Sequence, residues 1–95
     1  MSSNTPRPLV AGNWKMNGLT AALIEAEKLA AGVAPGQTGG CETMLCPPAT
    51  LLALMRARLG SSPVLVGGQD CHANASGAHT GDISAEMIRL SLIHI

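Results

Sequence analysis

Two residues near the start of the chain, Asn13 and Lys15, place an amide and an ammonium directly after a short apolar run. Because side chains alternate between the two faces of a β-strand, Asn13 and Lys15 are expected to point the same way and Trp14 the opposite way. Lys15 offers a positive charge with three donors, and Asn13 offers a neutral donor and acceptor. This pair suits a small phosphorylated substrate that carries a carbonyl group.

The strands that must position this pair are short apolar runs. Residues 9–11, 43–46 and 64–66 are predicted to be strands, the first of them buried. Helical patterns separate these runs, and this alternation predicts parallel strands joined by right-handed crossovers. Sites of such sheets lie at the carboxyl ends of the strands, where Asn13 and Lys15 fall. Trp14, on the other face, is interpreted as a wedge between strand and helix.

The helices are predicted from the spacing of apolar residues. The first covers residues 19–33 and the second residues 49–59, with Gly60 as its C-cap. Ser84 is a candidate N-cap of a third helix, with an acidic residue in its first turn. The apolar faces are expected at Ala22, Ala26, Leu29, Ala30 and Val33 in the first helix, and at Leu51, Leu52, Met55 and Leu59 in the second.

Three cysteines, an odd number without CxxC spacing, do not indicate a disulfide framework. Cys41 and Cys46 are interpreted as small core residues. Cys71, His72 and His79 match no ligand spacing for a metal, so a metal site is not predicted. They fall in a long polar loop, residues 71–82, of the kind that is usually functional.

Four segments, taken together, resemble one family. In chain order they are AGNWKMN at residues 11–17, LCPP at 45–48, VGGQDC at 66–71 and SGAHTGDISAEM at 76–87. This set is similar to the N-terminal part of triosephosphate isomerase. The resemblance implies the first three βα units of a (β/α)8 TIM barrel, an incomplete α/β fold, because a whole barrel needs roughly 250 residues.

The resemblance also implies an activity. The family interconverts dihydroxyacetone phosphate and glyceraldehyde 3-phosphate through an enediol(ate), in glycolysis and gluconeogenesis, as a homodimer without cofactor or metal. By match, Lys15 is the catalytic cation that binds substrate, and Asn13 is its substrate-binding neighbour. Gln69 and Thr80 match dimer contacts beside the site. For Lys15 the alternative is an ordinary solvated surface lysine.

The resemblance covers residues 8–87. Residues 1–87 are therefore interpreted as the N-terminal part of a barrel domain, and residues 88–95 as a non-matching tail that is not native. His94 is not assigned as the family's catalytic histidine, because a helix alone needs about ten residues and too few separate it from Ser84. Without that histidine and the glutamate base, the chain as given is predicted to be inactive.

Composition excludes several classes of partner. Six basic and six acidic residues give a formal charge of zero, so nothing indicates binding to nucleic acid or to an anionic membrane. No apolar run approaches the roughly 18 residues of a membrane span. Residues 1–7 lack the apolar core of a secretory signal, so a cytoplasmic location is expected.

Two alternatives remain open from the sequence. The chain could be an inactive, aggregation-prone fragment, because three strands leave two unpaired edges and an uncovered face. It could also belong to another phosphate-binding barrel enzyme that shares only the lysine site.

Overall fold

The computed structural model of the protein describes residues 6–33 and 39–93, and a three-stranded parallel sheet is its framework. β1 (Leu9–Asn13) pairs with β2 (Glu42–Cys46), which pairs in turn with β3 (Leu65–Val66). The order of the strands in space therefore follows their order in the chain. The predicted parallel arrangement is confirmed.

A helix follows each strand. α1 (Leu23–Gly32) begins after a 3-10 turn, η1 (Thr20–Ala22), and α2 (Leu52–Leu59) begins after η2 (Ala49–Leu51). The sequence pattern predicted one continuous helix in each case. Neither 3-10 turn has a side-chain cap, and tightened first turns are common where helix ends have few partners. α3 (Ala85–Leu92) is the last element, and none of the described helices is long and apolar enough to cross a membrane.

Both predicted helix-end signals are confirmed. Gly60 follows α2 with a φ of 48°, and its N–H donates to the carbonyl oxygen of Arg56. This left-handed backbone favours glycine. Ser84 precedes α3, and its Oγ accepts a hydrogen bond of 3.2 Å from the backbone N–H of Met87. The hydroxyl thus satisfies one of the free donors at the start of the helix.

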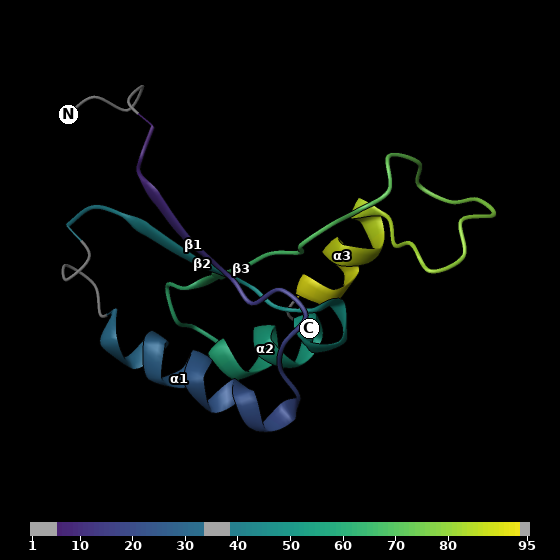
Figure 1. Ribbon diagram of the computed structural model, residues 1–95. Helices are drawn as coiled ribbons and strands as arrows, with labels where there is room; N and C mark the ends of the chain where they lie inside the picture. The colour runs from purple at the N-terminus through teal and green to yellow at the C-terminus, as the bar shows by residue number, and fades with distance from the viewer. Residues whose placement is uncertain (1–5, 34–38, 94–95) are drawn as a thin grey trace.

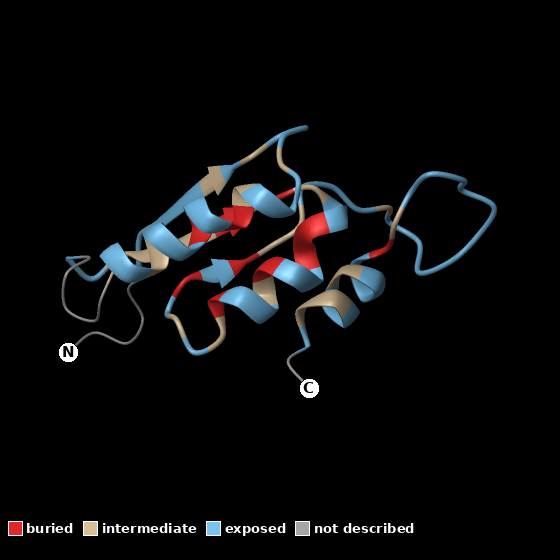
Figure 2. Ribbon diagram, turned by 90° about the horizontal axis from the view of Figure 1, so that it is seen from below, coloured by how far each residue is buried: buried red, intermediate tan, exposed pale blue. Residues whose placement is uncertain are grey.

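The core lies between the sheet and the helices that cover one of its faces (Figures 1 and 2). The predicted apolar face of α2 is confirmed, since all four of its residues are buried. On α1 the deepest residues are Ala26, which was predicted, and Leu23, which the predicted face omitted. The buried cluster is Leu23, Ala26, Leu45, Leu51, Leu52, Met55, Leu59, Val64 and Val66.

The prediction that the first strand is buried is wrong. Leu9 is 50% exposed and Val10 is 58% exposed, because β1 is an edge strand with β2 on one side only. Leu65 on β3 is 43% exposed. Figure 1 shows α1 and α2 on the same side of the sheet, and the opposite side is left open. Cys41 and Cys46 are half-buried free thiols rather than core residues.

This exposure generates a prediction about the isolated chain. Apolar side chains that remain in water on folding contribute little to stability, so the free energy of unfolding should be small. We expect a broad thermal transition of the 95-residue chain in circular dichroism. Leu65→Lys should also reduce concentration-dependent light scattering, because a charged side chain on an exposed strand disfavours its pairing with a second molecule.

The matched control is Leu54→Lys on α2, where a leucine of similar exposure, 46%, lies outside the sheet. It should leave the scattering nearly unchanged. A sharp, cooperative melt of the unmodified chain would contradict the description of an incomplete domain.

Candidate functional site

The candidate site lies where the parallel strands end. Beyond β1 the backbone N–H of Trp14 donates to the carbonyl oxygen of Cys46 at 3.0 Å, and beyond β3 that of Gly67 donates to the carbonyl oxygen of Leu45 at 3.0 Å. These bonds hold the segments after β1 and β3 against the end of β2. The loop that carries Asn13 and Lys15 is therefore at the carboxyl edge of the sheet, as predicted.

Lys15 does not continue the alternation of β1. The strand ends at Asn13, and Lys15 adopts a φ of 56°, in the left-handed region. For a residue other than glycine this conformation costs about 1–3 kcal/mol and persists only where the surroundings impose it. The expectation that strand alternation sets the direction of the Lys15 side chain is therefore wrong, because the chain has already left the strand.

Two side chains hold the peptide groups on either side of Lys15. The Oδ1 atom of Asn13 accepts a 2.8 Å hydrogen bond from the Lys15 N–H. The Nε2 atom of Gln69 donates to the Lys15 carbonyl oxygen at 2.8 Å, and also to that of Cys46 at 3.0 Å. Asn13 is thus engaged through its oxygen, and its amide nitrogen is left as a donor. Sequence reasoning had assigned to Gln69 only a dimer contact, and it missed this role.

Trp14 anchors the same loop from the other side. It is half-buried and packs against the core cluster, so its interpretation as a wedge is confirmed. The Nδ2 atom of Asn17 donates to the Trp14 carbonyl oxygen at 2.9 Å. Gly18 has a φ of 111°, and a Cβ there would lie 3.0 Å from the indole ring and 3.1 Å from Leu51. Glycine therefore permits both the turn and the close packing.

The charge of Lys15 has no anionic partner within residues 6–33 and 39–93. The ion pairs of that part of the chain join Arg7 to Glu42, Lys28 to Glu25 and Arg58 to Glu27, and all lie on exposed side chains. Lys15 itself is exposed. An exposed ammonium on a held backbone, at the carboxyl edge of a parallel sheet, can attract an anionic substrate.

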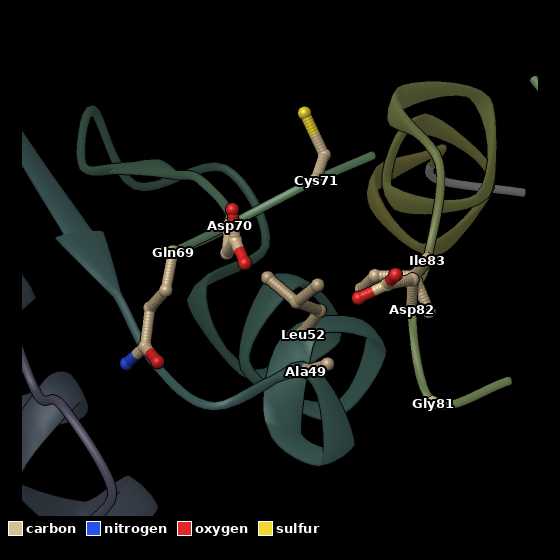
Figure 3. A pocket seen from close by; sticks show the side chains of 9 residues that line it. Ala49, Leu52, Gln69, Asp70, Cys71, Gly81, Asp82 and Ile83 are labelled. Atoms are coloured by element: carbon tan, nitrogen blue, oxygen red, sulfur yellow. The ribbon is translucent and has the colours of Figure 1, made fainter. Parts of the chain in front are cut away.

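The nearby cavity of about 140 Å³ is not the place for such a substrate (Figure 3). Figure 3 shows Leu52 between the carboxylates of Asp70 and Asp82, which would repel a phosphate. Neither Asn13 nor Lys15 belongs to its lining, which consists of Ala49, Leu52, Gly68, Gln69, Asp70, Cys71, Gly81, Asp82 and Ile83.

The remaining candidates lie in the protruding loop before α3 (Figure 1). Thr80 is exposed in this loop. Among the described residues no hydrogen bond joins it to Asn13, Lys15 or Gln69. His72 and His79 stack on each other. Among the described residues no group of three or more histidine, cysteine or acidic side chains has the arrangement to hold a metal ion. His94 lies outside the described residues.

Comparisons with known proteins define the class. A family model described as triosephosphate isomerase matches residues 8–94. A triosephosphate isomerase of Bradyrhizobium sp. (strain ORS 278) is 60% identical over 83 residues, which are 86% of this chain and 33% of that one. One of Xanthobacter flavus is 58% identical over 83 residues, 87% of this chain and 32% of that protein.

A solved structure supports the same class. The crystal structure of triosephosphate isomerase from Bartonella henselae superposes with a TM-score of 0.82 at 44% identity, over 90% of this chain and 35% of that chain. The fold is therefore an incomplete part of a TIM barrel. The chain belongs to the triosephosphate isomerase family, and it spans about a third of the length of the relatives it matches. The alternative of a different phosphate-binding barrel family is wrong.

The family match includes residues 88–94, part of the segment that sequence reasoning set apart at Met87. α3 is continuous across that point, and Ile88 packs against the core. A Cβ on Gly68 would lie only 2.7 Å from Cδ1 of Ile88, so the two are in close contact. The origin of residues 88–95 stays a prediction.

The hold on Lys15 can be tested in a chimera in which residues 8–87 replace the matching first third of the Bartonella henselae enzyme. Gln69→Leu should lower the free energy of urea-induced unfolding by about 1 kcal/mol, because exposed hydrogen bonds contribute about that much. Gln69→Glu should cost more, since a carboxylate would face two carbonyl oxygens. Asn17→Leu is the comparison variant, because it removes one hydrogen bond in the same turn whereas Gln69→Leu removes two. An unchanged stability of the Gln69→Glu chimera would contradict this role.

Proposed function

We propose that this chain is the N-terminal third of an enzyme that interconverts dihydroxyacetone phosphate and glyceraldehyde 3-phosphate through an enediol(ate). Membership of the triosephosphate isomerase family supports the reaction. The observation that carries the assignment to residues is the backbone of Lys15, held in a left-handed conformation by Asn13 and Gln69. Such a hold is what a precisely placed cation needs.

Lys15 is the cation in this proposal. Its ammonium binds the anionic substrate and stabilises the negative charge that develops on oxygen as the enediolate forms. At a separation of about 4 Å and an effective dielectric constant near 20, one unit charge pair amounts to about 4 kcal/mol. The Asn13 amide nitrogen, free of the bond that Oδ1 makes to the Lys15 N–H, donates to a substrate oxygen.

The chain by itself lacks the proton-transfer groups of this reaction. Triosephosphate isomerase is itself the standard example of a glutamate base acting with a neutral histidine electrophile. No segment of this chain resembles the motifs that carry those two residues. Acid–base groups contribute on the order of 10²–10⁴-fold each, so the 95-residue chain should show no measurable turnover.

The chimera described above tests the role of Lys15. Lys15→Ala should lower kcat/KM by roughly 10³-fold, which is the rate equivalent of about 4 kcal/mol. Lys28→Ala is the matched control. Lys28 is the only other lysine of the chain, and its exposed side chain on α1 forms a long salt bridge of 3.7 Å with Glu25. This variant should leave kcat/KM unchanged. Equal activity of the two variants would overturn the role of Lys15, and turnover by the isolated chain would overturn its predicted inactivity.

We also propose that the intact enzyme is a homodimer in which the loop of residues 71–82 reaches a second copy. The loop protrudes from the rest of the molecule (Figure 1), and both Gln69 and Thr80 at or near it are exposed. Met16, next to Lys15, is 94% exposed, and a second copy that covered it would remove its apolar surface from water. The cytoplasmic location expected from the sequence stays a prediction.

Sedimentation of the chimera tests this arrangement. The unmodified chimera should sediment as a dimer, and Met16→Glu should shift it toward the monomer, because an unpaired charge would be buried in the contact. Ile24→Glu is the control, since Ile24 is 54% exposed on α1. Dissociation caused by both variants alike would count against a contact centred on Met16.

A further inference from the structure

Gln69, whose side chain holds the Lys15 backbone, directly follows two glycines. Neither Gly67 nor Gly68 adopts a positive φ, so backbone conformation does not require glycine at these positions. Glycine loses more conformational freedom on folding than any other residue. The backbone of Gln69 is therefore free to move unless neighbouring side chains confine the two glycines.

Side chains on both faces of the sheet confine this pair. A Cβ on Gly67 would lie 3.0 Å from Sδ of Met44 and 3.5 Å from Sγ of Cys46. These two residues lie on the face of β2 that is turned away from the core. A Cβ on Gly68 would lie 2.7 Å from Cδ1 of Ile88, which packs against the core. The glycines thus permit close approach from both faces.

The helix that carries Ile88 is fixed at both ends. α3 lies beside α2 (Figures 1 and 2), and the Oγ atom of Ser84 caps its first turn. At the other end, Nε of the half-buried Arg56 on α2 donates to the carbonyl oxygen of Leu92 at 3.3 Å. A cation is favourable there, because the last carbonyl oxygens of a helix carry partial negative charge. A fixed helix therefore holds Ile88 against Gly68.

The contact of Ile88 is one residue away from the hold on Lys15. Gln69 follows Gly68, and its Nε2 atom donates to the carbonyl oxygens of Lys15 at 2.8 Å and of Cys46 at 3.0 Å. Gln69 is exposed, so water competes for both hydrogen bonds as soon as its backbone moves. One amide can serve two carbonyl oxygens here only while that backbone stays in place.

We propose that Ile88 is a positioning residue for Lys15, acting through Gly68 and Gln69. Its side chain confines Gly68 from the side of α3, and this confinement keeps the Gln69 amide on the Lys15 carbonyl oxygen. The effect on catalysis rests on the proposed function, whereas the effect on the Gln69 amide does not. The support for the candidate site thus includes the residue directly after the last of the four motif segments.

Exchange of the Gln69 side-chain amide protons with water, measured by nuclear magnetic resonance on the 95-residue chain, tests the contact. Gln69→Leu identifies the signal by its loss. Ile88→Ala should raise the exchange rate by about fivefold or more, which corresponds to the loss of one hydrogen bond. Leu90→Ala is the matched control, because Leu90 lies on the same helix and is 69% exposed. It should leave the rate unchanged. An unchanged rate in Ile88→Ala, or an equal rise in both variants, would overturn the proposal.

A milder variant separates this effect from general unfolding. The backbone amide of Met55, a fully buried residue of α2, reports whether the core stays folded. If Ile88→Ala exposes that amide, Ile88→Val takes its place, because it removes only Cδ1, the atom nearest to Gly68. The Gln69 exchange rate should then rise by about twofold while Met55 stays protected, since the loss of one methyl group costs less than that of three carbons. A rate equal to that of the unmodified chain would overturn the contact.

Kinetics test the step from Ile88 to Lys15, in a chimera that carries residues 8–88 instead of 8–87. Ile88→Ala should lower kcat/KM by about tenfold, because small displacements of a catalytic group are costly. In a Gln69→Leu background the same change should have little further effect, since both changes act through one amide. Effects that multiply would overturn the positioning role.

The two measurements also separate the contact from the proposed function. If amide exchange responds to Ile88→Ala but neither Ile88→Ala nor Lys15→Ala lowers kcat/KM, the proposed function is overturned and the contact is supported. If Lys15→Ala lowers kcat/KM and Ile88→Ala changes neither quantity, the positioning role is overturned and the proposed function is supported.

Discussion

The candidate site depends on the left-handed backbone of Lys15. This conformation is unfavourable for a residue with a side chain, and it exists here because both adjacent peptide groups are bound. Asn13 holds the N–H and Gln69 holds the carbonyl oxygen. Gln69 also donates to Cys46, so its amide joins the segments after β1 and β3 to the last residue of β2. A change at Gln69 therefore acts on Lys15 without touching its side chain.

The hydrogen bonds that hold Lys15 lie within the described part of the chain, but its ammonium is not enclosed there. β1 has a partner on one edge only, and Leu9, Val10 and Leu65 remain in water. Lys15 is exposed, and the cavity of about 140 Å³ beside Gln69 has two carboxylates in its lining. Water that remains around an ammonium weakens its attraction for an anion. The hydrogen bonds that fix the Lys15 backbone are thus formed in this structure, while the ammonium itself remains surrounded by water.

Much of the fold could be predicted from the sequence because its signals are local. The buried face of α2, the glycine that ends it and the serine that caps α3 are all set by neighbouring residues. Burial of β1 could not be predicted, because it depends on which strands and helices lie beside it. The apolar run of β1 is the same whether or not those neighbours are present.

The candidate site could be predicted by residue type but not by geometry. Asn13 and Lys15 do lie at the carboxyl edge, yet alternation failed because the strand ended two residues before Lys15. The bond from Gln69 to Lys15 joins residues 54 positions apart, and the stack of His72 on His79 depends on a folded loop. No periodicity marks such contacts. A polar residue directly after a glycine pair, as at Gln69, was the only available signal.

The backbone conformation at position 15 does not explain why the residue there is a lysine. Within the described ranges every other residue of positive φ is glycine, including Gly18 three positions later. Glycine at position 15 would relieve the strain and would still offer the N–H to Asn13 and the carbonyl oxygen to Gln69. The backbone thus gains nothing from a lysine there. What only lysine adds is a long side chain with a positive charge, at the edge of the sheet where parallel α/β proteins bind their substrates.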